Sequence, residues 1–176
     1  IFLNSFRNLF EKFIPEIIST RNLKDPYVFI LGDLFNDRNY LNSKTINVVI
    51  DTFKSCPLHK KILIGNHDLF YKNRKDINSI KILQDFSNIE IISDVTRLNI
   101  NNRKIVLSPW IVDSLDSNEL FSEKADIALG HFEINGFEVV SGHRESNGLN
   151  PELFKNNFKM TFSGHFHIRS EIDSIT

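Results

Sequence analysis

The sequence predicts an α/β fold in a single domain. Apolar segments with a helical period alternate along the chain with short apolar runs typical of β-strands. The 176 residues are 41% hydrophobic, which is enough to bury a core. No repeat, low-complexity tract or Pro/Gly/Ser-rich linker divides the chain. We therefore expect residues 1–176 to form one domain, with a mixed sheet because long returns and one hairpin connect the strands.

The helices are predicted from apolar side chains that recur every three or four residues. This spacing occurs in residues 2–18, in residues 46–53 and across residues 77–86. The strands are predicted from short apolar runs at residues 27–31, 61–64, 90–92, 96–100, 104–107, 126–129, 137–140 and 159–162. Between the fourth and fifth of these runs, Asn101 and Asn102 predict a hairpin turn, because asparagine tolerates a positive φ.

The composition excludes several classes of protein. The 21 basic and 22 acidic residues give a net charge of −1, so no overall basic field points to nucleic acid. The longest uninterrupted apolar runs are four or five residues, whereas a membrane span needs roughly 20. The single cysteine, Cys56, excludes a disulfide framework and a multi-cysteine zinc site. We expect a cytoplasmic protein without a membrane segment.

One pattern carries chemistry: an apolar strand ends in glycine, and a residue able to bind metal follows it. In α/β sheets, sites form in the loops beyond the carboxyl ends of the strands. Glycine at such an exit lets the backbone turn sharply and approach an ion closely. The pattern occurs at Gly32-Asp33, Gly65 to Asp68, Gly130-His131 and Gly164 to His167. We therefore expect Asp33, Asn66, His131, His165 and His167 to converge.

These residue types suit a site for two metal ions. Carboxylate, carboxamide and imidazole groups are ligands for Mn²⁺, Fe or Zn²⁺. The carboxylate of Asp33 can bridge two ions roughly 3.5–4 Å apart. His165 and His167 are two residues apart, so in an extended segment they face the same side and each can serve a different ion. His67 faces away from Asn66 and suits a proton donor that its neighbour Asp68 orients.

Other candidates fit simpler explanations. His59 and His143 lie in polar segments without a partner motif. The basic run at residues 72–75 fits a solvated face, with contact to a phosphate backbone as the alternative. Trp110, which follows Pro109, fits an anchor in the core or a loop better than a platform for base stacking.

At these motifs the sequence resembles the calcineurin-like metallophosphoesterases. The ordered motifs of that family are D-x-H, G-D-x-x-[DN], G-N-H-[DE], G-H and G-H-x-H. Within the family, the resemblance is to SbcD-type exonuclease subunits and T4-like phage recombination endonucleases, through stretches such as Ser108 to Trp110. The last four motifs stand here as Gly32 to Asn36, Gly65 to Asp68, Gly130-His131 and Gly164 to His167. The resemblance implies an αββα sandwich with mixed β-sheets.

The resemblance also implies a role for each site residue. Asp33 would bridge two divalent metal ions, with Mn²⁺ the usual cofactor and Fe, Zn²⁺ or Mg²⁺ the alternatives. His167 would complete the first metal site, while Asn66, His131 and His165 would hold the second. His67, beside Asp68, would be the catalytic histidine in the hydrolysis of a phosphodiester. For the nuclease branch, the implied substrate is DNA, the implied partner is an SMC-like ATPase of the SbcC type, and a homodimer is common.

Two departures from the family pattern shape the expectations. The D-x-H motif, which should precede the helix at residues 2–18, is absent, so we expect residues 1–176 to be a catalytic domain that lacks its N-terminal strand and is incomplete at both ends. Asn36 stands where many relatives have aspartate.

Three functions stay open: a DNA exonuclease or endonuclease, a phosphatase or phosphodiesterase for phosphoproteins, nucleotides or small phosphoesters, and an inactive scaffold that only binds partners.

Overall fold

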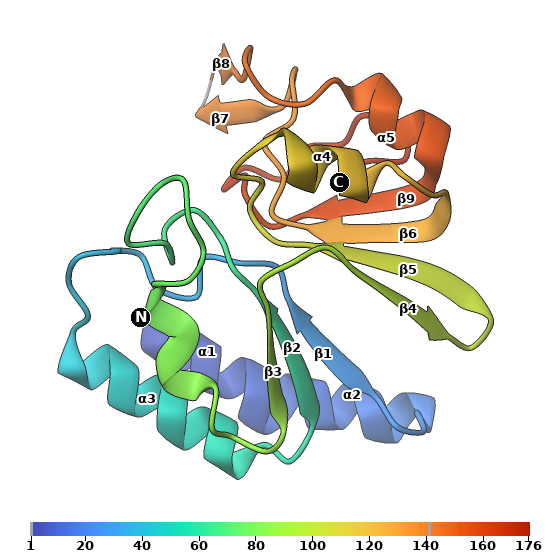
Figure 1. The fold of residues 1–176 in the computed structure, drawn as a ribbon. Helices are drawn as coiled ribbons and strands as arrows, with labels where there is room; N and C mark the ends of the chain where they lie inside the picture. The colour runs from blue at the N-terminus through green and yellow to red at the C-terminus, as the bar shows by residue number, and fades with distance from the viewer. Residues whose placement is uncertain (1, 141) are drawn as a thin grey trace.

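Two β-sheets lie face to face between two layers of helices in the computed structural model, which describes residues 2–140 and 142–176 (Figure 1). The first sheet has the order β1-β2-β3 and the second β4-β5-β6-β9. The predicted αββα sandwich is confirmed. The strands are β1 (Tyr27–Ile30), β2 (His59–Leu63), β3 (Ile89–Ile92), β4 (Thr96–Ile100), β5 (Arg103–Ser108), β6 (Ala125–Gly130), β7 (Glu138–Val140), β8 (His143–Arg144) and β9 (Phe158–Ser163).

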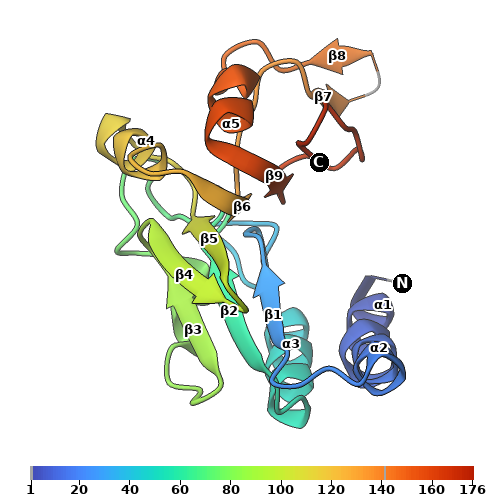
Figure 2. The same cartoon turned by 90° about the vertical axis from the view of Figure 1, so that its right-hand side faces the viewer.

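The helical layers cover the outer faces of the two sheets (Figure 2). On the side of the first sheet, the N-terminal helix widens for one π-turn before Pro15, whose ring nitrogen has no hydrogen to donate. The helices are α1 (Phe2–Asn8), the π-turn (Leu9–Phe13), α2 (Ile14–Arg21), α3 (Ser43–Ser55), a 3₁₀ helix (Ser79–Leu83), α4 (Ser114–Leu120) and α5 (Pro151–Asn157). The helices predicted from residues 2–18 and 46–53 are both present.

The second sheet is mixed, as predicted. Strand β4 pairs antiparallel with β5, whereas β5, β6 and β9 run parallel. Asn101 and Asn102 form the turn of the β4–β5 hairpin with φ angles of 51° and 61°. The first sheet is parallel throughout its described strands.

The core has three parts because each strand sends alternate side chains to opposite faces. Ile62 packs on the helical side of the first sheet, against Phe53 of α3. Its neighbour Leu63 points between the two sheets and shares a cluster there with Leu107. On the far side of the second sheet, Val106 belongs to the cluster under α4 and α5. The sandwich therefore has a helix–sheet core on each side and a sheet–sheet core in the middle.

Two parts of the sequence fold differently from the prediction. Residues 77–86 were predicted to form a helix, but only the short 3₁₀ helix forms there; it buries Ile80 and Leu83, whose three-residue spacing suits its pitch. Helices α4 and α5 were not predicted, because each buries only one side chain and shows no apolar period. Asp113 and Asn150 cap them by accepting hydrogen bonds from the first backbone amides.

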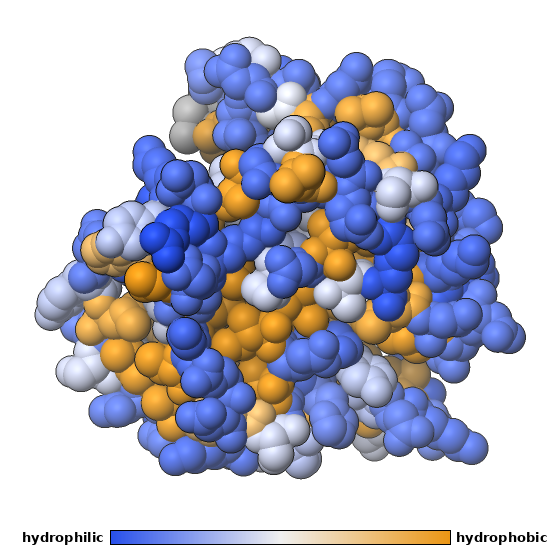
Figure 3. Space-filling model, in the orientation of Figure 1, coloured by the Kyte–Doolittle hydropathy of each residue, from blue (hydrophilic) through white to orange (hydrophobic). Residues whose placement is uncertain are grey.

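The surface seen in Figure 3 is largely hydrophilic, with apolar side chains gathered over β2 and β3. Strand β3 is at the edge of its sheet, where an ion pair joins Lys61 of β2 to Glu90. Charge on an edge strand discourages pairing with other chains. In the basic run at residues 72–75, Arg74 is paired with Asp76 and Lys75 with Asp116.

Among the described residues, no helix is both long and apolar enough to cross a membrane.

Candidate metal centre

The carboxyl ends of β1, β2, β6 and β9 meet where the two sheets adjoin. In the first sheet, Asp33 follows β1 and Asn66 follows β2, while His131 and His165 follow β6 and β9 in the second. Main-chain contacts join the sheets at this point: the amide of Trp110 donates to the carbonyl of Ile64 over 2.7 Å. The site is thus assembled from four strand ends that are far apart in the sequence.

His131 is at the centre of this arrangement. Its side chain is fully buried, and its Nδ1 atom lies 2.7 Å from the carbonyl oxygen of Leu31. A carbonyl oxygen only accepts hydrogen bonds, so Nδ1 carries the hydrogen and Nε2 keeps its lone pair. A histidine held in this way presents Nε2 as a ligand with a fixed orientation.

Three further ligand atoms surround Nε2 of His131. Oδ1 of Asn66 lies 2.9 Å away, and Oδ2 of Asp33 and Nδ1 of His165 each lie 3.2 Å away. The ligand atoms of Asp33, His131 and His165 all lie within 4.8 Å of one another. The structure thus brings together four of the five predicted ligands.

The donor set fits a divalent cation. In a six-coordinate site with bonds of roughly 2.1 Å, adjacent ligand atoms are separated by roughly 3 Å. The distances of 2.9–3.2 Å around Nε2 agree with that value. A carboxylate oxygen, an amide oxygen and imidazole lone pairs repel one another when they converge, and a cation among them removes that repulsion. The mixture of oxygen and nitrogen ligands without a thiolate suits Mn²⁺, Fe or Zn²⁺.

Two glycines make room for the ligands. Gly32 has a φ of +90°, and a Cβ atom there would collide with the ring of His131. At Gly65, a Cβ atom would collide with the carboxylate of Asp33. The glycines thus allow ligand side chains from neighbouring strands to approach the backbone.

Asp68 ties the loop after β1 to the loop after β2. Its fully buried carboxylate accepts hydrogen bonds through Oδ2 from the amides of Asp33 and Gly65, both at 2.9 Å. Through Oδ1 it accepts longer bonds from the Phe35 amide and the Ser79 hydroxyl. Burial raises the pKa of Asp68 to about 6, even though the amide hydrogen bonds favour its charged form.

Asp33 has the opposite shift. Burial by itself would raise its pKa, but the hydrogen bond and the charge that His131 contributes when its ring is protonated outweigh that effect, so the pKa lies below its ordinary value. Its Oδ1 atom also accepts a hydrogen bond of 2.9 Å from the amide of His67. The carboxylate is therefore charged and held from two sides, as a metal ligand requires.

The ring of His67 is oriented by Asn36 and not by its neighbour Asp68. Nδ1 of His67 lies 3.0 Å from the carbonyl oxygen of Asn36, whereas the carboxylate of Asp68 points into the buried loop junction. Sequence reasoning missed this contact because it involves the backbone of Asn36. The sequence feature that could have indicated this contact is the motif at Gly32 to Asn36, which includes both Asp33 and residue 36.

His165 and His167 have different surroundings. Burial, together with the charge that His131 carries when its ring is protonated, lowers the pKa of His165 to about 4, so the ring of His165 is neutral and available as a ligand near neutral pH. His167 is exposed and is not part of the four-ligand cluster; it lines a neighbouring cavity of about 340 Å³ with Leu31 and Phe166. The structure therefore does not bring His167 into the group around His131.

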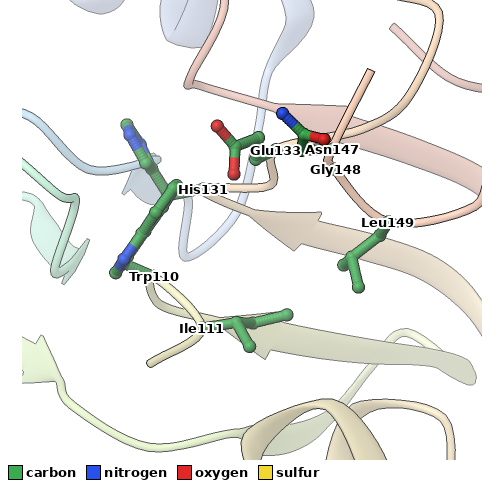
Figure 4. A pocket seen from close by; sticks show the side chains of 7 residues that line it. All are labelled: Trp110, Ile111, His131, Glu133, Asn147, Gly148 and Leu149. Carbon is green, nitrogen blue, oxygen red and sulfur yellow. The ribbon is translucent and has the colours of Figure 1, made fainter. Parts of the chain in front are cut away.

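Trp110 packs against the cluster. Its ring centroid lies 5.9 Å from that of His131 and 5.2 Å from that of His165. Trp110 and His131 also line a cavity of about 160 Å³ that extends to Glu133 and Leu149 (Figure 4). Glu133 was not among the predicted site residues, although it stands only two positions after His131.

A sandwich of two sheets with candidate metal ligands at the strand ends is consistent with a metallophosphoesterase. The Calcineurin-like phosphoesterase family model matches residues 2–169, and the chain belongs to that family. It is 30% identical over 152 residues to Exonuclease subunit 1 of Enterobacteria phage T4. That match covers 82% of this chain and 44% of the phage protein, so the chain spans less than half the length of this relative. A solved structure of a protein of unknown function from Aquifex aeolicus matches 94% of this chain and 70% of its own, with a TM-score of 0.37 and 17% identity.

Proposed function

We propose that this protein is a metal-dependent phosphodiester hydrolase that cleaves DNA, as an exonuclease or endonuclease subunit of a recombination or repair complex. The observation that carries the proposal is the convergence of Asp33, Asn66 and His165 on Nε2 of His131. These residues occur in the order of the family motifs, and the phage relative is named an exonuclease subunit. Residues 1–176 act as one catalytic domain in this proposal.

Asp33, Asn66, His131 and His165 hold one divalent cation in this proposal, and Asp33 and His167 contribute to a second. Mn²⁺ is the proposed metal, because oxygen and imidazole ligands suit it. Two such ions acidify a water molecule and stabilise charge on the attacking and leaving oxygens of a phosphodiester. The hydrogen bond from His131 to Leu31 keeps the central ligand in the orientation that this role needs.

His67 is the proposed catalytic group. Its Nδ1–H donates to the carbonyl oxygen of Asn36, so in the doubly protonated ring the hydrogen on Nε2 is the one given to the leaving oxygen, which leaves a neutral imidazole. The amide of His67 also donates to the carboxylate of Asp33 over 2.9 Å, which holds the proposed proton donor beside a proposed metal ligand. Asp68, proposed from the sequence as its catalytic partner, supports His67 by holding the two loops together.

The proposed partners follow from the same relationship. DNA is the proposed substrate, an SMC-like ATPase of the SbcC type is the proposed partner subunit, and the complex contains a homodimer in the cytoplasm. The net charge of −1 is low for a DNA-binding protein, so regions or subunits outside these residues would supply much of the backbone contact. The main alternative is a phosphatase or phosphodiesterase that acts on phosphoproteins, nucleotides or small phosphoesters.

Cleavage assays with matched substrates test the proposal. The protein is incubated with Mn²⁺ and supercoiled or linear DNA, and in parallel with bis-p-nitrophenyl phosphate, p-nitrophenyl phosphate and a phosphopeptide. We expect the protein to cleave DNA and bis-p-nitrophenyl phosphate, and we expect a chelator to abolish both activities. Asp33→Asn should remove this activity, while Asp37→Asn, which keeps the oxygen that accepts from the amide of Asn39, should retain it. Hydrolysis of monoesters alone contradicts the nuclease function, and no hydrolysis with bound Mn²⁺ favours the inactive scaffold.

A further inference from the structure

The cavity of about 160 Å³ beside the metal centre is a built pocket. Its floor is made where the loop at residues 145–149 is joined to the segment after β6: the Leu149 amide donates to the Glu133 carbonyl over 2.7 Å, and the Asn135 amide donates to the Leu149 carbonyl over 2.9 Å. Gly148 allows this contact, because a Cβ atom there would lie 2.6 Å from the carbonyl oxygen of Glu133. Main-chain hydrogen bonds therefore hold the floor in place, and the pocket exists before a ligand enters.

The lining has an apolar part and a polar part. Trp110, Ile111 and Leu149 supply apolar surface, while Glu133 and Asn147, in the upper part of the view in Figure 4, supply polar groups. Pockets for drug-sized ligands usually measure roughly 300–1,000 Å³. A cavity of about 160 Å³ is instead suited to one small flat group.

The carboxylate of Glu133 needs a donor. The side chain is half-buried, yet no described residue of the chain donates a hydrogen bond to its carboxylate or forms an ion pair with it. The side-chain amide of Asn147 also makes no hydrogen bond with any part of the protein that the structure describes. A partly buried carboxylate without a donor loses stability that a ligand with an N–H group can restore.

The imidazole ring of His131 lies between the pocket and the metal centre. His131 lines the pocket and supplies Nε2 to the cluster, and Trp110 packs against the rings of both His131 and His165. In a nucleotide, the sugar ring likewise separates the phosphate from the base. A phosphate held at the cluster would therefore place its own base at this pocket.

We propose that this pocket binds the base of the nucleotide whose phosphate occupies the metal centre, and that Glu133 selects bases with an exocyclic amino group. The inference rests on the proposed action on DNA. Cytosine and adenine carry an amino group beside a ring nitrogen that accepts, so Glu133 accepts from the first and the amide of Asn147 donates to the second. Uracil and thymine present a carbonyl oxygen in place of the amino group, and this oxygen repels the carboxylate.

The only tryptophan of the chain, Trp110, lines the pocket, so its fluorescence reports binding directly. The protein is titrated with dCMP and with dUMP in Mn²⁺, which is proposed to hold the phosphate, and chromatography checks that the nucleotides stay intact. The two nucleotides differ only at this edge of the base, where uracil has a carbonyl oxygen and an N–H in place of the amino group and the accepting nitrogen of cytosine. We expect saturable quenching with dCMP binding about tenfold more tightly than dUMP, as one selective polar contact provides. Deoxyribose 5-phosphate and inorganic phosphate, which lack a base, should leave the emission unchanged.

Two variants distinguish a specific role of Glu133 in base selection from the general effect of removing one negative charge. Glu133→Gln should reduce the preference for dCMP over dUMP to less than about twofold, because the amide no longer offers two accepting oxygens. Glu16→Gln, on the exposed face of α2, removes the same charge and should keep the full preference. Equal affinity for dCMP and dUMP in the wild type, or an unchanged preference in Glu133→Gln, overturns the proposal. Quenching by p-nitrophenyl phosphate as strong as that by dCMP also overturns it, since the pocket would then bind any flat ring.

The outcomes distinguish this inference from the proposed nuclease function. If the protein cleaves DNA with Mn²⁺ but Trp110 does not respond to dCMP, the base pocket is wrong and the nuclease function stands. If Trp110 responds with the expected preference but DNA is not cleaved, the pocket stands as a nucleotide site and the nuclease function is wrong.

Discussion

The ring of His131 donates its Nδ1 hydrogen to the carbonyl oxygen of Leu31 over 2.7 Å, although 100 positions separate the two residues in the sequence. Leu31 follows the first strand of one sheet, and His131 follows the third strand of the other. The bond therefore ties the two sheets together at the candidate metal centre. It also fixes which nitrogen of His131 is free, since a histidine that donates through Nδ1 presents Nε2 to a metal.

Replacement of His131 tests the central ligand. We expect His131→Gln to weaken Mn²⁺ binding by more than about 100-fold, because loss of a supporting partner alone costs roughly 10–100-fold and this change removes a ligand as well. Isothermal titration calorimetry of wild type and variant measures the effect. His143→Gln, in the exposed strand β8, is the matched control and should bind like the wild type. Equal affinity in the two variants would rule out His131 as a ligand.

The number of bound ions follows from the ligands that the described residues supply. In the proposed site, Asp33, Asn66, His131 and His165 would supply four ligands to one position, whereas the second would have only Asp33 and His167, and His167 lies outside the cluster. Affinity follows the number and geometry of ligands, so residues 1–176 should bind about one Mn²⁺ tightly and any further ion weakly. Equilibrium dialysis with metal analysis counts the ions. Two tight sites would contradict this expectation.

His67 should act in catalysis without holding the metal. We expect His67→Asn to lower the rate of DNA cleavage by roughly 10²–10⁴-fold, the usual range for a general acid or base. Mn²⁺ affinity should be unchanged, because the ring is bonded to Asn36 and is outside the four-ligand cluster. Single-turnover cleavage and calorimetry on the same preparation measure the two effects. Loss of bound Mn²⁺ in this variant would mean that His67 is a ligand.

Much of this architecture could be predicted from the sequence because its signals are local. The turn at Asn101 and Asn102 needs only residues that tolerate positive φ, and the glycine at each strand exit precedes its ligand directly. Contacts through the backbone leave no such signal. The carbonyl of Asn36 orients His67, whereas the sequence drew attention only to the side chain at this position, which stands where many relatives have aspartate.

The helices and the pocket show a second limit of sequence patterns. Helix α5 depends on its cap, Asn150, and on one buried side chain, Phe154, so it shows no apolar period. The base pocket depends on a main-chain pairing between the segment after β6 and the loop at residues 145–149, which only the folded chain brings together. The place of His167, outside the cluster, likewise depends on the path of the chain after β9.

Asp68 should contribute to stability and not only to catalysis. Each of its oxygens accepts two hydrogen bonds, and the amide nitrogen of an asparagine cannot accept any. We expect Asp68→Asn to lower the free energy of unfolding by about 2–3 kcal/mol, the cost of leaving buried donors without an acceptor. Urea unfolding in a chelator measures this change. Asp76→Asn breaks an exposed ion pair and should cost less than about 1 kcal/mol, so equal stability of the two variants would contradict the role of Asp68.

The pKa of His165 predicts how stability depends on pH. Burial, together with the charge that His131 carries when its ring is protonated, lowers this pKa from its ordinary value of 6.5 to about 4. Between these two values the unfolded chain binds a proton that the folded protein does not, so the free energy of unfolding falls as the pH drops from 6.5 towards 4. The pKa of Asp68 is raised from 3.8 to about 6, so its protonation makes the free energy of unfolding rise as the pH falls over nearly the same pH range. The wild type therefore shows the sum of the two effects.

A difference measurement isolates the contribution of His165. His165→Gln removes this titration and leaves Asp68 in place, so the wild type should lose stability relative to His165→Gln as the pH falls from 7 to 5. Urea unfolding of the metal-free proteins at the two pH values gives the change, and His143→Gln corrects for the removal of an exposed histidine. The chelator is essential, because bound metal would stabilise the folded wild type, with its four ligands, more than the folded variant, with three. A difference between wild type and His165→Gln that stays constant from pH 7 to 5 would show that His165 is not buried beside His131 in the way that lowers its pKa.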